Sequence, residues 1–326
     1  MSRLFSLLGL LILLATGAPQ PVRAEPALWI VRDADSEMVL FGSMHLLPPG
    51  LSWRPKALDD ALAQADDLWF ELPVDPATEQ EAARLALRLG VLPPGPGLYE
   101  QLPEQSRLRL GRLAAKYGLP PNVLDQIKPW FAEIMLVTTM LGAEGAAAAH
   151  GVEQQVSATA PAGVRRRALE TAEDQLLAFD HVPMDEQLNS LAFNMWIMEE
   201  DRTAFDRLVA AWMAGDLATL EAEAVAPLEA VAPSLYQRLI VARNADWLAQ
   251  LQDRLEGSGR TVVVVGAGHL VGEVGLPERL RVRVSVIVAP TGSLADGVQV
   301  VCGLLFFATM TTCCSFVRKH LSMTWQ

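Results

Sequence analysis

The sequence predicts an α+β fold: a central mixed β-sheet with a large, mostly helical insertion between two halves that each contain a G-x-x-H motif. Three observations carry this prediction. Apolar and β-branched runs typical of strands lie near both ends of the chain, at 28–32, 38–41, 261–265 and 284–288. Residues 76–255 between them repeat apolar positions at helical spacing. Two of the five histidines follow strand-like runs in one shared context, Gly42-Ser43-Met44-His45 and Gly266-Ala267-Gly268-His269.

In the N-terminal half, the first two strands are joined by a polar turn at 33–37 and followed by a helix at 55–65. A third strand is predicted at 68–72, and it contains a charge, Glu71, in an otherwise apolar run. An ionised carboxylate inside a sheet is costly unless it is paired or bound to a metal. Two interpretations follow: an edge carboxylate that faces water, or a strand-end carboxylate that reaches the same site as the histidines.

The insertion is predicted to be a set of helices. They are expected at 104–116, 129–141, 173–181, 185–200, 202–213 and 233–255. A short strand at 167–169 would return the chain to the sheet just before Glu170, and Glu153 is expected to begin a helix, where the helix dipole favours a carboxylate. Arg243 and Asn244 are neighbours on the last helix and so project differently; each either is solvated or faces the histidines.

The last part of the predicted sheet begins with residues 261–265, which are β-branched at every position, as in a central buried strand. The glycine before each histidine turn is expected to let the backbone bend sharply after the strand. A helix at 277–282 and a strand at 284–288 complete the predicted domain.

Both ends of the chain differ in composition from the predicted domain. Arg3, the apolar stretch 7–15 and Val22-Arg23-Ala24 predict a signal peptide over 1–24, and hence an exported protein, periplasmic or extracellular. Residues 25–290 form the predicted domain. In the tail, 291–326, the stretch 298–317 is uncharged and long enough to span a bilayer, and two interpretations stay open: a membrane segment or an unstructured tail.

Charge and cysteine content narrow the function. The net charge is −12, and Arg165-Arg166-Arg167 is the one basic cluster, which argues against a nucleic-acid partner. All three cysteines lie in the tail, so neither disulfides nor thiolate chemistry are expected in the domain.

The histidine pair predicts chemistry at the carboxyl ends of the strands, where open α/β sheets bind ligands. Two imidazoles and a carboxylate commonly bind a divalent metal, which lowers the pKa of bound water. Without a metal, the same histidines can serve as general acid and base.

Six segments of the chain carry a resemblance to a known family: Gly42 to Pro48, Glu71, Lys128-Pro129-Trp130, Leu169-Glu170-Thr171 with Gln175 and Phe179, Arg243-Asn244 with Trp247, and Val265 to Leu270. Together these segments resemble the TraB/GumN family, which is similar to the TIKI metalloproteases and more distantly to the erythromycin-esterase and ChaN-like folds. The resemblance runs from about residue 27 to 288 and implies an α+β domain with both histidines at one site.

The resemblance also implies a metal-dependent hydrolase, most simply a peptidase. His45, Glu71 and His269 would hold a divalent ion, Mn²⁺ or Co²⁺ in preference to Zn²⁺, with Glu71 as ligand or general base. Arg243 or Asn244 would stabilise developing negative charge. The substrate would be a peptide or another small hydrolysable molecule. Two alternatives stay open: a non-catalytic envelope protein that binds a metal or ligand, related to polysaccharide production, and a metal-free esterase-like hydrolase.

Overall fold

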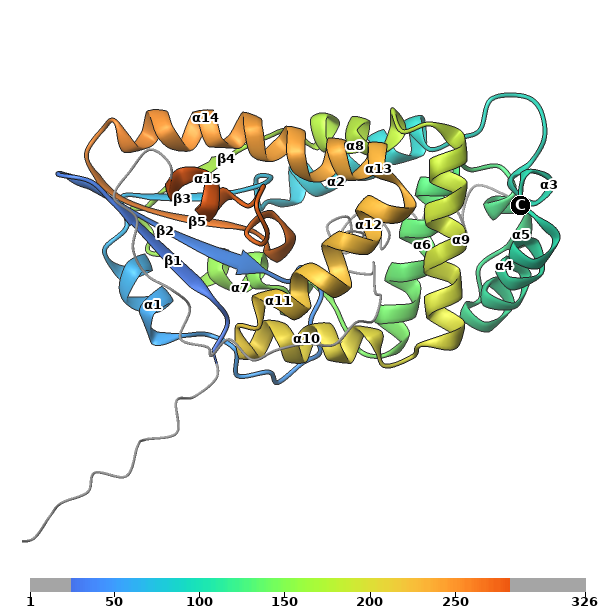
Figure 1. The fold of residues 1–326 in the computed structure, drawn as a ribbon, viewed down its shortest axis with the longest axis horizontal. Coiled ribbons are helices and arrows are strands. Elements are labelled where there is room, and N and C mark those ends of the chain that lie inside the picture. Colours follow the sequence, from blue (N-terminus) through green and yellow to red (C-terminus); the bar gives the residue numbers. More distant parts are fainter. Residues whose placement is uncertain (1–24, 282–326) are drawn as a thin grey trace, which may run out of the picture.

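Five strands form one mixed sheet in residues 25–281, the part of the chain that the computed structural model describes (Figure 1). The sheet lies at one end of the molecule, and most of the helical insertion extends away from it toward the other end. The predicted α+β fold with a mixed sheet and helical insertion is therefore confirmed. The predicted signal peptide at 1–24, the predicted strand at 284–288 and the tail at 291–326, with its possible membrane segment at 298–317, lie outside the described residues. No helix within 25–281 is long and apolar enough to cross a membrane.

The strand order is β1-β2-β5-β3-β4. The strands are β1 (Leu28–Arg32), β2 (Ser36–Ser43), β3 (Asp67–Phe70), β4 (Arg165–Ala168) and β5 (Gly259–Gly266). β1 pairs antiparallel with β2, whereas β2, β5, β3 and β4 run parallel to one another. β2 and β5 both extend beyond the predicted strands and pair Ser43 with Gly266 at their last residues. This register brings the two histidine motifs to the same edge of the sheet.

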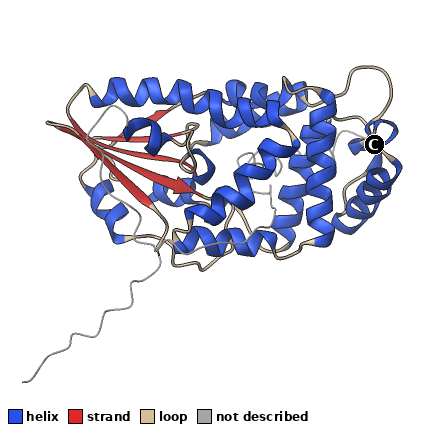
Figure 2. Cartoon of the chain, in the orientation of Figure 1, coloured by secondary structure: helices blue, strands red, loops and turns tan. Residues whose placement is uncertain are grey.

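Helices make up most of the remaining chain (Figure 2). The α-helices are α1 (Lys56–Ala63), α2 (Pro76–Leu89), α3 (Leu98–Gln101), α4 (Glu104–Tyr117), α5 (Pro121–Leu124), α6 (Pro129–Ala143), α7 (Val152–Thr159), α8 (Ala172–Asp180), α9 (Met184–Glu200), α10 (Ala204–Ala214), α11 (Leu217–Leu220), α12 (Ala226–Val231), α13 (Pro233–Tyr236), α14 (Arg243–Leu255) and α15 (Leu276–Arg281). Short 3₁₀-helices are η1 (Ala148–His150) and η4 (Ala267–His269), and π-helices are η2 (Glu221–Val225) and η3 (Gln237–Ala242).

Side chains alternate between the two faces of the sheet, and β5 is buried on both of them. In β5, Val262 and Val264 pack toward the helical insertion. Val263 and Val265 pack on the opposite face, against Trp247 of α14 and its neighbours. β5 is thus the central buried strand that its run of β-branched residues predicts.

Two local features position helices near the sheet edge. α8 begins with a capping box, in which Thr171 and Asp174 exchange side-chain and backbone hydrogen bonds. The helix predicted at 233–255 is interrupted by the π-helix η3, directly before Arg243. Such π-turns are frequent at functional sites. Trp196 of α9 is 41% exposed.

Candidate functional site

All five residues predicted to form the site meet at the carboxyl edge of the sheet. His45 follows β2, Glu71 follows β3, and His269 ends η4, directly after β5. Because these strands are adjacent and parallel, their carboxyl ends lie side by side. Glu71 is buried, so the interpretation of Glu71 as an edge carboxylate facing water is wrong. Arg243 and Asn244 reach the same place from the first turn of α14 and are also buried.

The glycines of the two motifs serve close packing, and the predicted sharp bend after each strand does not occur at them. Gly42 lies inside β2, and Gly266 has a φ of −50°, which any residue can adopt. A Cβ atom on Gly266 would stand 3.1 Å from Oε1 of Glu71 and 3.2 Å from Nε2 of His45. The space in front of Gly266 is therefore where these two side chains converge.

Arg243 is the hub of a buried ionic network. Its Nη2 donates to Oε2 of Glu71 at 2.6 Å and to Oε1 of Glu170 at 2.7 Å, and its Nε donates to Oε2 of Glu170 at 2.8 Å. Its Nη1 donates to the Leu239 carbonyl at 3.1 Å and lies 3.1 Å from Nε2 of His269. All five N–H groups of the guanidinium are thus used within the protein.

His269 is held in one orientation by two neighbours. Its Nδ1 lies 2.7 Å from Oδ1 of Asn244, and Arg243 approaches its Nε2. Since Arg243 can only donate, Nε2 accepts and Nδ1 carries the proton, an assignment that rests on the hydrogen-bond network. The ring also packs on Trp247, with 4.4 Å between centroids. His269 is therefore a fixed, neutral imidazole.

His45 has different surroundings. Its Nδ1 lies 2.6 Å from Oε1 of Glu153 in the first turn of α7, and its side chain is 15% exposed. The start of α7 docks on the backbone around His45, because Val152 N–H donates to the Met44 carbonyl at 3.1 Å. A Cβ on Gly151 would overlap the His45 carbonyl oxygen. Glu153 thus holds one ring nitrogen, and Nε2 faces the space before Gly266.

These contacts set the protonation of the site. Burial raises the pKa of Glu71, but the charge of Arg243, the two histidines and the Gly266 N–H outweigh burial and lower this pKa to about 2, so Glu71 is a carboxylate. Burial and the Arg243 charge lower the pKa of His269 to about 3. Burial lowers the pKa of His45, but the charge and hydrogen bonding of Glu153 outweigh it and place this pKa above its ordinary value. Of the two site histidines, His45 has the higher pKa and is therefore the one suited to take up a proton.

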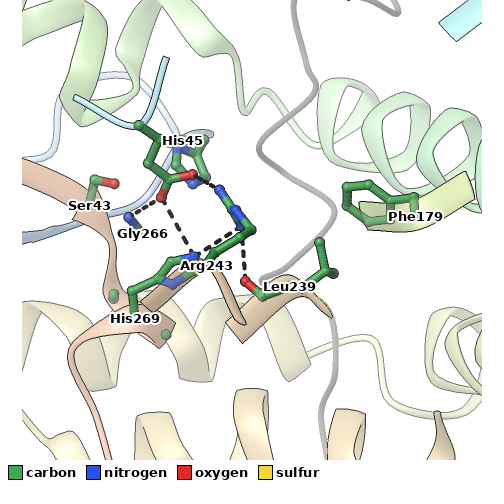
Figure 3. Close-up of a pocket in the computed structure, with 10 residues that line it drawn as sticks. Ser43, His45, Phe179, Leu239, Arg243, Gly266 and His269 are labelled. Carbon is green, nitrogen blue, oxygen red and sulfur yellow. Dashed lines mark hydrogen bonds and ion pairs between the residues drawn. The ribbon is translucent and has the colours of Figure 1, made fainter. Parts of the chain in front are cut away.

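A narrow pocket opens onto these groups, with a volume of about 20 Å³, enough for about one water molecule. Polar residues line one side, and Phe179 and Leu239 line the other (Figure 3). Ser43 also lines it, and its buried Oγ has no hydrogen-bond partner among the described residues. A buried hydroxyl without a partner is unusual in a folded protein, so this hydroxyl is available to a molecule in the pocket.

The predicted metal ligands do not form a complete set as they are arranged. Arg243 lies against the lone pair of Nε2 of His269, which would have to face the ion, and it also holds Oε2 of Glu71. Within residues 25–281, no group of three or more histidine, cysteine, aspartate or glutamate side chains is placed to hold a metal ion. The donors therefore fit a three-ligand metal site only if Arg243 moves, and metal binding stays a prediction.

Sequence reasoning did not assign Glu153, Glu170, Gln175 or Ser43 to the site. Glu153 was expected only to begin a helix, which it does, and its contact with His45 joins segments far apart in sequence. Gln175 donates to Glu71 at 3.3 Å and to Glu170 at 3.2 Å. For two of these residues the position in the sequence could have indicated the site. Ser43 lies inside a G-x-x-H motif, and Glu170 follows a predicted strand.

Known proteins are similar to this chain along most of its length. The sequence profile described as "TraB/PrgY/gumN family" matches residues 27–284. The chain is 26% identical over 257 residues to an uncharacterized protein, YbaP, of Escherichia coli K12, covering 78% of this chain and 92% of that protein. The YbaP protein of Shigella flexneri is similar to the same extent. No solved structure gives a significant match.

Proposed function

We propose that this chain, which belongs to the TraB/PrgY/gumN family, is a hydrolase in which His45 is the general base. Its substrate is a peptide or another small molecule with a hydrolysable carbonyl, and nucleic acid is not a substrate for so acidic a protein. The observation that carries the proposal is the contact between His45 and Glu153. It holds Nδ1 at 2.6 Å and leaves Nε2 facing a pocket with room for one water molecule.

In this mechanism Nε2 of His45 takes a proton from the water in the pocket, and the oxygen of that water attacks the substrate carbonyl carbon. The imidazolium that forms lies near two carboxylates, Glu153 and Glu71, which both favour its positive charge. When the carbonyl–leaving-group bond breaks, the same proton passes from Nε2 to the leaving nitrogen or oxygen. A carboxylate-oriented histidine of this kind recurs in unrelated hydrolases.

The other polar groups have supporting roles. The Ser43 hydroxyl has no partner among the described residues, so it can hydrogen-bond the water or the developing oxyanion. Arg243 was expected to stabilise developing charge, but every one of its N–H groups already has a partner. We therefore assign Arg243 to holding Glu71 and His269 in place, and Asn244 to orienting His269.

The second candidate is the metal-dependent peptidase. One observation favours it: Nε2 of His45 and Oε1 of Glu71 converge on the space before Gly266. In that case His45, Glu71 and His269 would hold Mn²⁺, Co²⁺ or Zn²⁺, and the ion would supply an activated water. Arg243 would first have to leave Nε2 of His269.

One experiment separates these candidates. The purified protein is assayed on a casein-derived peptide mixture and on small esters, with and without EDTA, while bound metal is measured by mass spectrometry. Chelator-resistant turnover that is lost in His45→Ala and kept in the control His181→Ala, an exposed position, is the expected result. Turnover lost with EDTA and restored by Mn²⁺ or Co²⁺ indicates the second candidate.

Absence of turnover on either substrate class, with metal or without, would contradict both candidates. It would instead indicate a non-catalytic envelope protein that binds a metal or ligand.

Export is also part of the proposal, on the strength of Arg3 and the apolar stretch at 7–15. The mature protein would begin at Glu25 and would be periplasmic or extracellular. Mass spectrometry of the N-terminus after cell fractionation tests this. An uncleaved Met1 in the cytoplasmic fraction contradicts it.

A further inference from the structure

A second buried carboxyl group lies away from the site, between α6 and α9 of the helical insertion. Glu133 is the only charged residue of α6, a helix that is buried on nearly all sides. Its residue is 1% exposed, and no ionic partner contacts it among the described residues. A carboxylate in such a place is strongly disfavoured unless it is paired.

The hydrogen bonds around Glu133 are unevenly distributed. Ser190 Oγ donates to Oε1 of Glu133 at 3.0 Å, and Nδ2 of Asn194 donates to the same oxygen. Oε2 of Glu133 and Oδ1 of Asn194 are both buried and have no partner among the described residues. Oε1 of Gln187, two turns before Asn194 on α9, is also buried without a partner among the described residues. The cluster has acceptors without donors.

One proton resolves this imbalance. The carboxyl group of Glu133 and the side-chain amide of Asn194 are both planar groups with two polar atoms each. Nδ2 of Asn194 already donates to Oε1 of Glu133. The second polar atom of each group is an oxygen without a partner, Oε2 of Glu133 and Oδ1 of Asn194. We propose that Glu133 binds a proton in the folded protein and donates it from Oε2 to Oδ1 of Asn194, closing a two-hydrogen-bond ring that joins α6 to α9.

The charged groups on the neighbouring helices do not offset this. Arg109 and Arg112 of α4 are paired with Glu199 of α9, at 2.7 Å and 2.9 Å. Burial raises the pKa of Glu133 well above its ordinary value, against the hydrogen bonds from Ser190 and Asn194. The proton site thus rests on its acceptors and on the absence, within residues 25–281, of a cation paired with the Glu133 carboxyl.

Folding is therefore coupled to proton uptake. A glutamate in the unfolded chain has a pKa of about 4.3, so below that pH both states hold the proton. As the pH rises, the unfolded state loses its proton first, and the folded state loses stability until its own carboxyl ionises. In that window the contribution of Glu133 to the unfolding equilibrium changes about tenfold per pH unit.

Glu133→Gln tests the proposal because glutamine reproduces the ring without a titratable proton. Denaturant unfolding is measured from about pH 4 to pH 9 for the unmodified protein, for Glu133→Gln and for the exposed control Glu104→Gln. Titratable groups that all three proteins share cancel when their free energies of unfolding are subtracted from one another. We expect Glu133→Gln to become steadily more stable than the unmodified protein as the pH rises. The ratio of the two unfolding equilibrium constants should change about tenfold per pH unit. A difference that stays constant across the pH range would overturn the proposal.

Infrared spectroscopy supplies a test that does not depend on the variant. A buried protonated carboxyl has a carbonyl band distinct from that of carboxylates. At neutral pH the unmodified protein is expected to show this band, and isotopic labelling of glutamate is expected to shift it. Its absence at neutral pH would show that Glu133 is ionised.

Discussion

Nδ1 of His269 lies 2.7 Å from Oδ1 of Asn244, and this contact fixes the state of the histidine. The amide nitrogen of Asn244 is used elsewhere, donating to the carbonyls of His269 at 3.2 Å and Val274 at 2.9 Å. Its oxygen must therefore face the ring, where it accepts the Nδ1 proton. The remaining nitrogen, Nε2, can then only accept, which suits the Arg243 guanidinium. One buried amide thus sets both the tautomer and the partner of His269.

Asn244→Asp should raise the pKa of His269 from about 3. The new carboxylate would contact Nδ1 and favour the imidazolium, by about 1 to 3 pKa units for an opposite charge this close. An NMR titration of the histidine ring signals measures the change. Asn189→Asp, at an exposed position on α9, is the control and should leave the pKa unchanged. An unaltered titration in Asn244→Asp would contradict the assigned tautomer.

Glu153→Gln should lower the pKa of His45. In the unmodified protein burial lowers this pKa and Glu153 raises it by more; without the charge, only burial and weaker effects remain. A base must be neutral to act, so turnover by the unmodified protein should rise as the pH passes through the raised pKa of His45. In the variant that rise should move to lower pH. The pH–rate profile and the His45 titration measure it, with the exposed Glu104→Gln as control. Identical profiles would exclude Glu153 as the partner of the base.

Arg243→Met should destabilise the protein strongly. Glu71 and Glu170 would remain buried without their shared counter-charge, and breaking a buried pair typically costs about 3 to 5 kcal/mol. Urea unfolding measures the loss. The matched control is Arg238→Met, one turn earlier in the same run of helices and exposed, which should change the free energy of unfolding little. Equal stability of the two variants would mean that Arg243 is not the hub of a network.

The sequence predicts the scaffold well because local patterns specify it. The β-branched run in β5 and the strand-like runs before each histidine predict the sheet edge. The parallel pairing of β2 with β5 then brings His45 and His269 together. The patterns do not place element ends: both histidine motifs begin inside strands, and the last long helix contains a π-turn that periodicity does not reveal.

The partners within the site could not be predicted in the same way. The contact of Glu153 with His45 depends on where α7 docks, which is a property of the tertiary fold. The same holds for Arg243, whose position on an amphipathic helix fits a solvated residue equally well. An isolated glutamate such as Glu133 gives no sign in the sequence that it is buried beside an amide.

Gly266→Ala tests the space in which the proposed chemistry occurs. The backbone of Gly266 suits any residue, so strain is not expected. The new methyl group would stand 3.1 Å from Oε1 of Glu71 and 3.2 Å from Nε2 of His45, closing the gap between them. Glu71 or His45 must then shift by a few tenths of an ångström. Turnover should fall, by up to about 100-fold, while the protein stays folded.

Gly111→Ala on α4 is the matched control, because a Cβ there meets nothing within 4 Å. Alanine is the better helix former by about 1 kcal/mol, so this variant should keep its turnover and gain stability. Rates and unfolding midpoints of both variants are compared with the unmodified protein. Full activity in Gly266→Ala would place the reacting water elsewhere, since no water could then reach Nε2 of His45 across the methyl group.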